Sequence, residues 1–289
     1  MIRRNIQNVL KLGYKTVSGR SVFAKTPLLS KLFRSIAKRV IVNNGGVYAI
    51  KGHEMHIPAD DACFYEYTLG DYESAKTEVF VKSLHTGDVA IDVGAHIGYY
   101  TLLAARQVGE NGRVFAFEPD PDNYDLLVKN IKLNNYENVV PIKKAVSNKT
   151  ASTELFLASS STHSLFRAPT SEPARSIVVE SVSLDDFFSG CPSSVTSRIR
   201  LIKMDIEGAE MLALLGMAQL IKGTPLTMIT EVARHQIINS GFEPAEFLSK
   251  LVEYGFELTV IGEKAYSTSA IIDMANRGTW LDLLCFKAH

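Results

Sequence analysis

The stretch VAIDVGAHIGYYTLLAA, from Val89 to Ala105, carries the clearest structural signal in the chain. It begins as a run of apolar residues, turns at Gly94 and Gly98, and continues with apolar residues at three- and four-residue spacing. This order predicts a buried strand, a tight loop and a helix. Asp92 stands two residues before Gly94, so an acid lies near the end of the predicted strand.

Strands and helices alternate in the same way over the rest of the chain. We expect strands at 89–93, 113–118, 139–146, 199–205, 225–232, 256–261 and 280–287, and helices at 98–107, 122–134, 208–221 and 244–254. This alternation predicts an α/β fold with a doubly wound, mostly parallel sheet. No clear helical pattern separates the last two strands, so we expect them to pair antiparallel at one edge.

The composition narrows the class of protein. The 289 residues are 46% hydrophobic, enough for one large α/β domain with an extension. Lys plus Arg and Asp plus Glu both number 31, so the net charge gives no general case for nucleic-acid binding. The cysteines Cys63, Cys191 and Cys285 lie far apart, which favours neither a disulfide framework nor a zinc site and fits a reducing compartment. No long apolar run or secretory signal is present, so we expect no membrane span and no export.

The N-terminal segment differs from the rest of the chain. Residues 1–53 contain eleven Lys or Arg and no Asp or Glu, and the apolar spacing predicts two basic amphipathic helices. Three interpretations stay open: packing on the domain, contact of residues 1–43 with an anionic membrane or polyanionic substrate, and mitochondrial targeting. We expect a cytoplasmic location, at the membrane surface if this segment binds lipid, or a mitochondrial one.

The glycine turn predicts the kind of cofactor. In an open parallel sheet, ligands bind beyond the carboxyl ends of the strands. The spacing here is G-x-x-x-G with Asp92 ahead of it, whereas dinucleotide sites use G-x-G-x-x-G. A carboxylate would repel the pyrophosphate of NAD or FAD and would suit a cofactor with an ammonium group. Glu118 ends the next strand 24 residues after Gly94, near the ~20-residue offset of a ribose-binding acid. Together these residues indicate S-adenosylmethionine, with Asp92 near its methionine part and Glu118 on its ribose.

A second cluster of acids follows the fourth strand, in RLIKMDIEGAEMLALLGM from Arg200 to Met217. Asp205 ends the strand and is expected to face the ligand crevice, where it holds the substrate or orients the transferred methyl group. Glu207 and Glu210 lie near a helix start, where the helix dipole favours acids.

Several stretches together resemble a known family. DVGAHIGYYT, FAFEPDPDNYDLL, KKAVSNKTA, SVSLDDFF and IKMDIEGAEMLAL occur in this order, and over about residues 65 to 287 the chain resembles the FkbM family of S-adenosylmethionine-dependent methyltransferases. The resemblance implies a seven-stranded Rossmann-like sheet and O-methylation, often of sugar hydroxyls in glycans, glycolipids or natural products. We expect a basic extension with short strands at 1–60 and the methyltransferase domain at 61–289.

Cofactor-binding residues follow from the matching positions. They are Asp92, Gly94, His96, Gly98, Tyr99, Glu118, Ala145, Val146 and Asp205. The family loop usually has Asn where this chain has His96. Both side chains can hydrogen-bond the cofactor through nitrogen, but His96 adds a titratable group.

Methylation of a sugar hydroxyl favours a general base near the acceptor, since such catalysis contributes roughly 10²–10⁴-fold. The candidates are Asp205, Glu231 and His235 at strand ends, and His163 in the Ser-rich insertion. We rank Glu231 above the histidines because its strand end opens on the same crevice. The Asp-Asn pair of Mg²⁺-dependent catechol-type enzymes is replaced by Glu231-Val-Ala, so we predict metal-free catalysis. The [DN]-P-P-[YF] motif of amine methylation is missing, which disfavours base or amide N-methylation.

The sequence is also compatible with other functions. An NAD-dependent oxidoreductase can use a similar sheet, although Asp92 and the loop spacing disfavour it. The acceptor can also be a small molecule other than a sugar. A catalytically silent binding protein is the third class, and the joint presence of Asp92, Glu118 and Asp205 disfavours it.

Overall fold

The computed structural model describes residues 45–70, 72–157, 163–167, 175–222 and 225–287. The basic segment 1–43 and its expected helices lie outside the described residues, so its proposed contact with an anionic membrane stays a prediction. The chain forms two compact units, Met1–Ser74 and Ala75–His289. The expected division between an extension at 1–60 and a domain at 61–289 also stays a prediction. No helix of the described ranges is long and apolar enough to cross a membrane.

The first unit contains the short strands expected around Val47 to Ala59. Strands β1 (Gly46–Ile50) and β2 (His53–Ile57) form an antiparallel hairpin. Helix α3 (Phe64–Leu69) follows, and its buried Phe64 ring packs edge-on against Tyr48 with 5.2 Å between the ring centroids.

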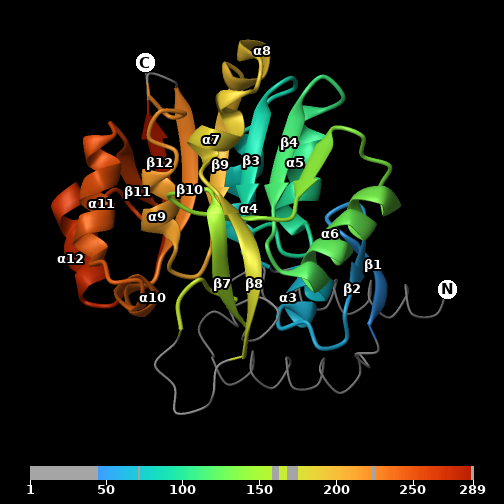
Figure 1. Ribbon diagram of the computed structural model, residues 1–289, viewed down its shortest axis with the longest axis horizontal. Helices are drawn as coiled ribbons and strands as arrows, with labels where there is room; N and C mark the ends of the chain where they lie inside the picture. The colour runs from blue at the N-terminus through green and yellow to red at the C-terminus, as the bar shows by residue number, and fades with distance from the viewer. Residues whose placement is uncertain (1–44, 71, 158–162, 168–174, 223–224, 288–289) are drawn as a thin grey trace. The chain divides into compact units, whose positions relative to one another are not determined.

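The second unit is built on a seven-stranded sheet with the order β11-β12-β10-β9-β3-β4-β5 (Figure 1). Its strands are β3 (Val89–Val93), β4 (Arg113–Phe117), β5 (Val139–Ile142), β9 (Ile199–Met204), β10 (Leu226–Val232), β11 (Glu257–Val260) and β12 (Leu281–Lys287). Neighbouring strands from β5 to β10 run parallel, and β12 runs antiparallel to both β10 and β11. The predicted doubly wound, mostly parallel sheet is confirmed.

Helices cover this sheet. They are α4 (Ser74–Lys82), α5 (Tyr99–Val108), α6 (Pro121–Leu133), α7 (Leu184–Ser189), α8 (Ser193–Thr196), α9 (Glu210–Leu215), α10 (Arg234–Asn239), α11 (Pro244–Glu253) and α12 (Thr268–Asn276). The expectation that no helix separates the last two strands is wrong, because α12 lies between β11 and β12. The Ser267 side chain caps it by accepting from the Ala270 N–H, and Ile271 and Ala275 are its buried residues.

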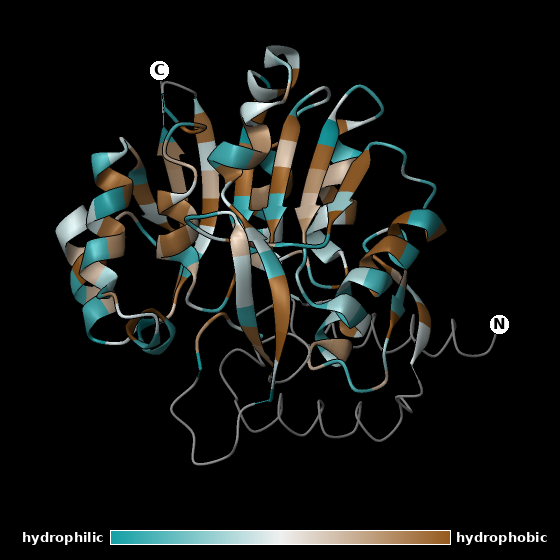
Figure 2. Ribbon diagram, viewed as in Figure 1, coloured by the Kyte–Doolittle hydropathy of each residue, from teal (hydrophilic) through white to brown (hydrophobic). Residues whose placement is uncertain are grey.

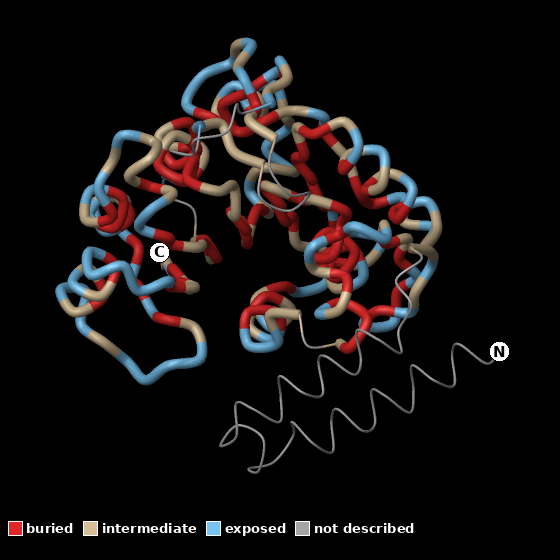
Figure 3. Tube along the Cα trace, turned by 90° about the horizontal axis from the view of Figure 1, so that it is seen from below, coloured by how far each residue is buried: buried red, intermediate tan, exposed pale blue. Residues whose placement is uncertain are grey.

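The buried strands explain why the sheet forms. Every residue of β3 is buried, as expected for a parallel strand covered on both faces. Figure 2 shows the strands of the large sheet with mostly hydrophobic residues, and Figure 3 shows buried residues in the interior with exposed ones outside. Ile91 and Val93 belong to the core cluster that includes Phe117, whose ring lies 5.1 Å from Phe187 of α7. Alternation along β3 turns Asp92 toward the opposite face, which α5 covers.

A small second sheet lies beside the carboxyl end of the large one. The expected strand at 139–146 splits after β5, and its last residues form β6 (Ala145–Val146). This strand pairs with β8 (Arg175–Val182), which pairs antiparallel with β7 (Ala151–Leu157). The β7–β8 hairpin extends beyond the arrowheads of β3 and β9 (Figure 1), and so it borders the edge where parallel sheets bind ligands.

Candidate functional site

One cavity opens where β3, β4 and β9 end. The space between its lining atoms is about 560 Å³ and includes a part open to solvent. The small sheet supplies one wall through Leu155 of β7 and Leu165. Seven of the predicted site residues line it: Gly94, His96, Glu118, Ala145, Val146, His163 and Asp205.

The glycine turn after β3 brings two strand ends together. Gly94 has φ +79. A Cβ at this position would lie 2.1 Å from the carbonyl oxygen of Asp205, the residue that follows β9. Only glycine permits this approach. The turn continues through His96, which has φ 50 and donates its backbone N–H to the Glu118 carboxylate at 2.8 Å. The loop is thus fastened to the end of β4.

Glu118 presents a buried carboxyl group to the cavity. Its Oε1 accepts from the Asp120 N–H at 3.0 Å, and its Oε2 accepts from the His96 N–H. Burial raises the pKa of Glu118 to about 7, although these backbone hydrogen bonds oppose the shift. A carboxylate oxygen has a second lone pair, so a ligand hydroxyl in the cavity can still donate to this group.

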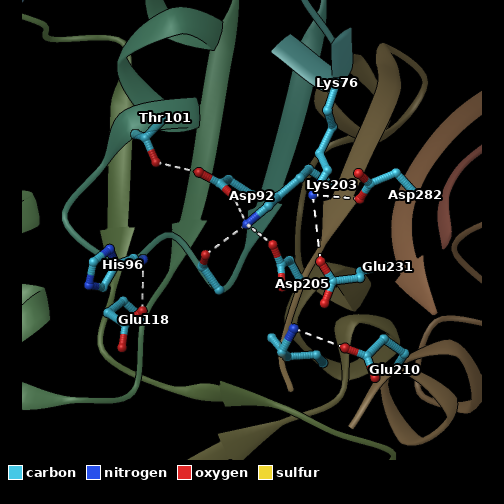
Figure 4. Close-up of polar contacts among 12 residues, drawn as sticks. Lys76, Asp92, His96, Thr101, Glu118, Lys203, Asp205, Glu210, Glu231 and Asp282 are labelled. Carbon is cyan, nitrogen blue, oxygen red and sulfur yellow. Dashed lines mark hydrogen bonds and ion pairs between the residues drawn. The ribbon is translucent and has the colours of Figure 1, made fainter. Parts of the chain in front are cut away.

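Asp92 lies outside the cavity lining. Its side chain is 1% exposed and points to the α5 side of the sheet, where Thr101 donates to Oδ2 at 2.6 Å. Lys203 of β9 is the register partner of Asp92, so both side chains project from the same face. The Lys203 Nζ lies 3.6 Å from Asp92 Oδ1 (Figure 4). The structure thus shows Asp92 as part of a buried ion pair beneath the loop, and its contact with the cofactor stays a prediction.

Lys203 is a site residue that the sequence reasoning missed. Its Nζ donates to the Gly94 carbonyl at 2.9 Å and lies 3.9 Å from Asp205 Oδ2 (Figure 4). One buried cation therefore holds the start of the glycine turn and balances two carboxylates. The sequence feature that could have identified Lys203 is its charge within the otherwise apolar strand LIKM.

Glu207 also lines the cavity, which corrects its interpretation as an acid of the helix start. Helix α9 begins only at Glu210, whose side chain accepts from the N–H of Ile206 in the preceding loop at 3.0 Å. Glu207 has φ 54, and its carbonyl accepts from Ser164 Oγ at 2.7 Å. Gln236 Nε2 donates to its carboxylate. These contacts fix the backbone and side chain of Glu207 at the cavity.

The buried setting changes the acidity of Glu207. Burial, followed by the nearby Asp205 carboxylate, raises the pKa of Glu207 to about 8. The neighbouring Gly208 has φ +102, and a Cβ there would lie 2.6 Å from the Gln236 carbonyl oxygen. Glycine at this position therefore allows the loop between β9 and α9 to pack against α10.

Besides Asp92, four predicted residues lie outside the lining. Gly98 is the residue before α5, and Tyr99 shares a hydrogen bond of 3.1 Å with Thr77 through its hydroxyl. Glu231 lies 3.8 Å from Lys76 Nζ (Figure 4), and burial and Asp205 raise its pKa well above the usual range. His235 is exposed on α10. Their predicted roles in binding or catalysis stay predictions.

His163 reaches the cavity from the β7–β8 connection. Its Nε2 lies 3.8 Å from Asp120 Oδ2, while Asp120 Oδ1 accepts from two N–H groups at the start of α6. Burial lowers the pKa of His163, although Asp120 opposes this shift. A neutral imidazole is therefore favoured at neutral pH.

The methyltransferase FkbM domain matches residues 92–258, more than half of the chain. The chain belongs to this family. It is 24% identical over 169 residues to the hexuronic acid methyltransferase AglP of Haloferax volcanii, a match that covers 57% of this chain and 62% of that protein. It is also 24% identical over 240 residues to the methyltransferase sdnD of Sordaria araneosa, covering 70% of this chain and 89% of that protein. The chain thus spans less than two thirds of the archaeal relative.

Solved structures share the sheet architecture only distantly. A SAM-dependent methyltransferase from Aquifex aeolicus aligns with 14% identity and a TM-score of 0.43, over 78% of this chain and 93% of that chain. This likeness is too weak to carry an argument about function.

The cavity of this FkbM-family protein fits S-adenosylmethionine, the family's cofactor. The Glu118 carboxylate suits the ribose hydroxyls, which are hydrogen-bond donors. Ala145, Val146 and Leu155 offer apolar surface for the adenine ring, and Asp205 offers a negative charge for the cationic methionine part. The donors and acceptors of the cavity therefore match the chemistry of the cofactor.

Replacing Glu118 by alanine is expected to weaken binding of S-adenosylhomocysteine by about 1–3 kcal/mol, because the ribose hydroxyls lose their acceptor. Isothermal titration calorimetry measures the change directly. Glu110→Ala, at an exposed acid outside the cavity lining, is the matched control and should bind as the wild type does. Equal affinities for Glu118→Ala and the wild type would remove Glu118 from the ribose site.

The raised pKa of Glu118 also predicts how pH acts on the protein. Ribose hydroxyls donate to the carboxylate form, so binding should tighten as the pH rises through about 7. The unliganded protein should show the opposite trend in stability. Between the ordinary pKa of 4.5 and about 7, the folded state binds more protons than the unfolded chain. The free energy of unfolding therefore falls as the pH rises through this window.

Calorimetry and urea unfolding across this pH range test both trends. The Glu118→Gln variant has no titratable group at this position. Its cofactor affinity and its free energy of unfolding should therefore vary less with pH than those of the wild type. Identical pH profiles for the two proteins would show that another group governs the behaviour.

Proposed function

We propose that this FkbM-family protein transfers a methyl group from S-adenosylmethionine to a hydroxyl group of a sugar-containing acceptor. The observation that carries the proposal is that three carboxyl groups line one cavity: Glu118 follows β4, and Asp205 and Glu207 follow β9, the two strands on either side of β3. The first suits a ribose, and the other two suit an acceptor hydroxyl. The similarity to a hexuronic acid methyltransferase supports a sugar acceptor.

The bound cofactor supplies an electrophilic methyl group on a sulfonium centre. The residues of the chain must align the acceptor oxygen with that methyl group and exclude water. The apolar residues Leu155 and Leu165, together with Val146, line the cavity. Their contribution is orientation and desolvation, which need no titratable group.

Glu207 is the proposed acceptor of the hydroxyl proton. It lines the cavity, and its carboxylate is oriented by Gln236 while its backbone is held by Ser164. A base with a pKa near the working pH is an efficient proton acceptor, and the pKa of Glu207 is about 8. Asp205 already pairs with the Lys203 ammonium 3.9 Å away, so its proposed part is to accept a hydrogen bond from the acceptor hydroxyl.

The assignment changes the ranking of the sequence-based candidates. Glu231 was ranked above the histidines, but it lies outside the cavity lining and is paired with Lys76. His235 is also outside, whereas His163 lies at the cavity with Asp120 beside it. The proposed mechanism therefore assigns proton transfer to Glu207 and leaves His163 a binding role.

Transfer of an isotopically labelled methyl group tests the proposal. The protein is incubated with S-adenosylmethionine labelled in the methyl group and with fractionated extract, and the products are hydrolysed to monosaccharides. The proposal expects label in O-methyl sugars, with the same yield in EDTA because the predicted catalysis is metal-free. Label confined to protein, nucleic acid or amine products would exclude it. Activity lost in EDTA and restored by Mg²⁺ would exclude the metal-free part.

A further inference from the structure

Trp280 is the only tryptophan of the chain, and it is 54% exposed. It immediately precedes β12, whose first residue, Leu281, pairs with Val232 at the end of β10. In turn β10 runs parallel to β9, with Thr230 beside Met204. Trp280 therefore lies at the same edge of the sheet as Asp205, the cavity residue that follows Met204.

The indole ring has neighbours on β10 and α10. Its N–H is near enough to the Glu231 carboxylate to lower the pKa of that group, against the larger effect of burial. The His235 ring lies on α10 with its centroid 5.6 Å from that of Trp280 and a tilt of 47°. An aromatic side chain that is oriented before a ligand arrives loses little conformational entropy on binding.

The groups around Trp280 have the chemistry of a polyol site. The face of an indole ring is apolar and electron-rich, and so it suits the C–H face of a pyranose. Glu231 and its register partner Asp282 supply carboxylate acceptors for hydroxyl groups, at side-chain exposures of 11% and 35%. Lys76 lies between these two acids, 2.7 Å from Asp282 and 3.8 Å from Glu231 (Figure 4).

Trp280 and His235 lie near the cavity through two acids. Asp205 lines the cavity, and a carboxylate oxygen of Asp205 lies within 4.8 Å of one of Glu231, the residue of β10 beside Trp280. A chain of neighbours thus runs from the cofactor cavity through Asp205 and Glu231 to the aromatic pair. A ring stacked on Trp280 would lie on the acceptor side of the sheet edge.

We propose that Trp280 and His235 form an aromatic platform that stacks against the pyranose ring of the acceptor. The proposal rests on the proposed sugar methylation, because it assigns the ring of that substrate to a place beside Asp205 and Glu231. It makes Trp280 a determinant of acceptor binding and leaves the cofactor site unchanged.

The single tryptophan gives the test its signal. Methyl β-D-glucuronide and methyl β-D-glucoside are titrated into the protein saturated with S-adenosylhomocysteine, and the emission of Trp280 is recorded. The expected result is a saturable change with at least one glycoside and none with mannitol, an acyclic polyol without a pyranose face. Emission that responds to no pyranoside overturns the proposal.

Kinetics supply the second measurement, using the sugar fraction that accepts labelled methyl groups. Trp280→Ala is expected to raise the acceptor KM roughly tenfold or more with cofactor affinity unchanged, and Trp280→Phe to recover most of the loss. Phe286→Ala is the control, since Phe286 is 49% exposed on β12 and pairs with Thr227 near the opposite end of β10. It should leave KM unchanged.

Different results would overturn the proposed sugar methylation and the proposed aromatic platform. A wild-type protein that methylates sugars, with an unaltered KM in Trp280→Ala, overturns the platform and keeps the proposed function. Wild-type protein that transfers no label to any sugar overturns the proposed function, and the emission titration then judges the platform alone. A change of sedimentation coefficient in Trp280→Ala, without a change of KM, would assign the ring to a protein interface and also overturn the platform.

Discussion

Replacing Lys203 by methionine is expected to lower the free energy of unfolding by about 3–5 kcal/mol, because it leaves the Asp92 carboxylate buried without its cation. The two side chains are 6% and 1% exposed, so water cannot replace the lost charge. The Gly94 carbonyl also loses its donor, and cofactor affinity should fall with it. Urea unfolding followed by far-ultraviolet circular dichroism measures the change in stability.

Two variants separate the buried charge from other effects. Adding Asp92→Asn to Lys203→Met removes the unpaired charge and should recover part of the lost stability. Lys82→Met breaks the exposed Lys82–Glu78 pair, which is shorter at 2.6 Å but 72% and 67% exposed. Its cost should be far smaller than that of Lys203→Met, because solvent screens an exposed ion pair. Similar losses for Lys203→Met and Lys82→Met would refute the structural role of Lys203.

Replacing Glu207 by glutamine is expected to lower kcat by about 10²–10⁴-fold and to leave S-adenosylhomocysteine affinity nearly unchanged. The amide keeps the shape of the side chain but cannot accept the hydroxyl proton. The comparison needs kcat and KM for the sugar acceptor that methyl labelling identifies, together with calorimetry. Glu263→Gln, at an exposed acid, is the control for an acid-to-amide change.

Asp205 gives the contrasting result. If Asp205 holds a hydroxyl group and does not take its proton, Asp205→Asn should raise the acceptor KM with a much smaller effect on kcat. A large loss of kcat in Asp205→Asn, with wild-type kcat in Glu207→Gln, would exchange the two roles.

The sequence predicted the framework of the site because the framework depends on local patterns. The strand, turn and helix from Val89 to Ala105 follow from apolar periodicity and glycine spacing, and they place Gly94 at the cavity. Glu118 and Asp205 were found because each ends a parallel strand, and neighbouring parallel strands end at the same edge. For such residues, the position at the end of a strand is enough to predict that they lie at the site.

Residues whose role depends on side-chain direction were harder to predict. Asp92 lies one residue before the end of β3. Alternation along the strand turns its side chain to the face that α5 covers, where it lies beside Lys203. Glu207 looked like an acid of a helix start, yet its left-handed backbone places it before α9 and at the cavity. Sequence spacing does not give a φ angle or the partner across a sheet.

Long-range packing accounts for the remaining differences. Lys76 contacts Glu231 and Asp282 although more than 150 positions separate it from either acid in the chain. In the sequence, Trp280 is an ordinary aromatic residue before a strand. Its position near Asp205 and Glu231 depends on β12 pairing with β10. Such contacts are set by the tertiary fold, which no local pattern specifies.

Calorimetric titration of the wild-type protein with S-adenosylmethionine, S-adenosylhomocysteine and NAD is the decisive measurement. The cavity lined by Gly94, Glu118 and Asp205 is expected to hold a sulfonium cofactor and not a pyrophosphate. The account predicts saturable binding of both S-adenosyl compounds at one site per chain, and no heat of binding with NAD. Binding of NAD with none of either S-adenosyl compound would contradict it.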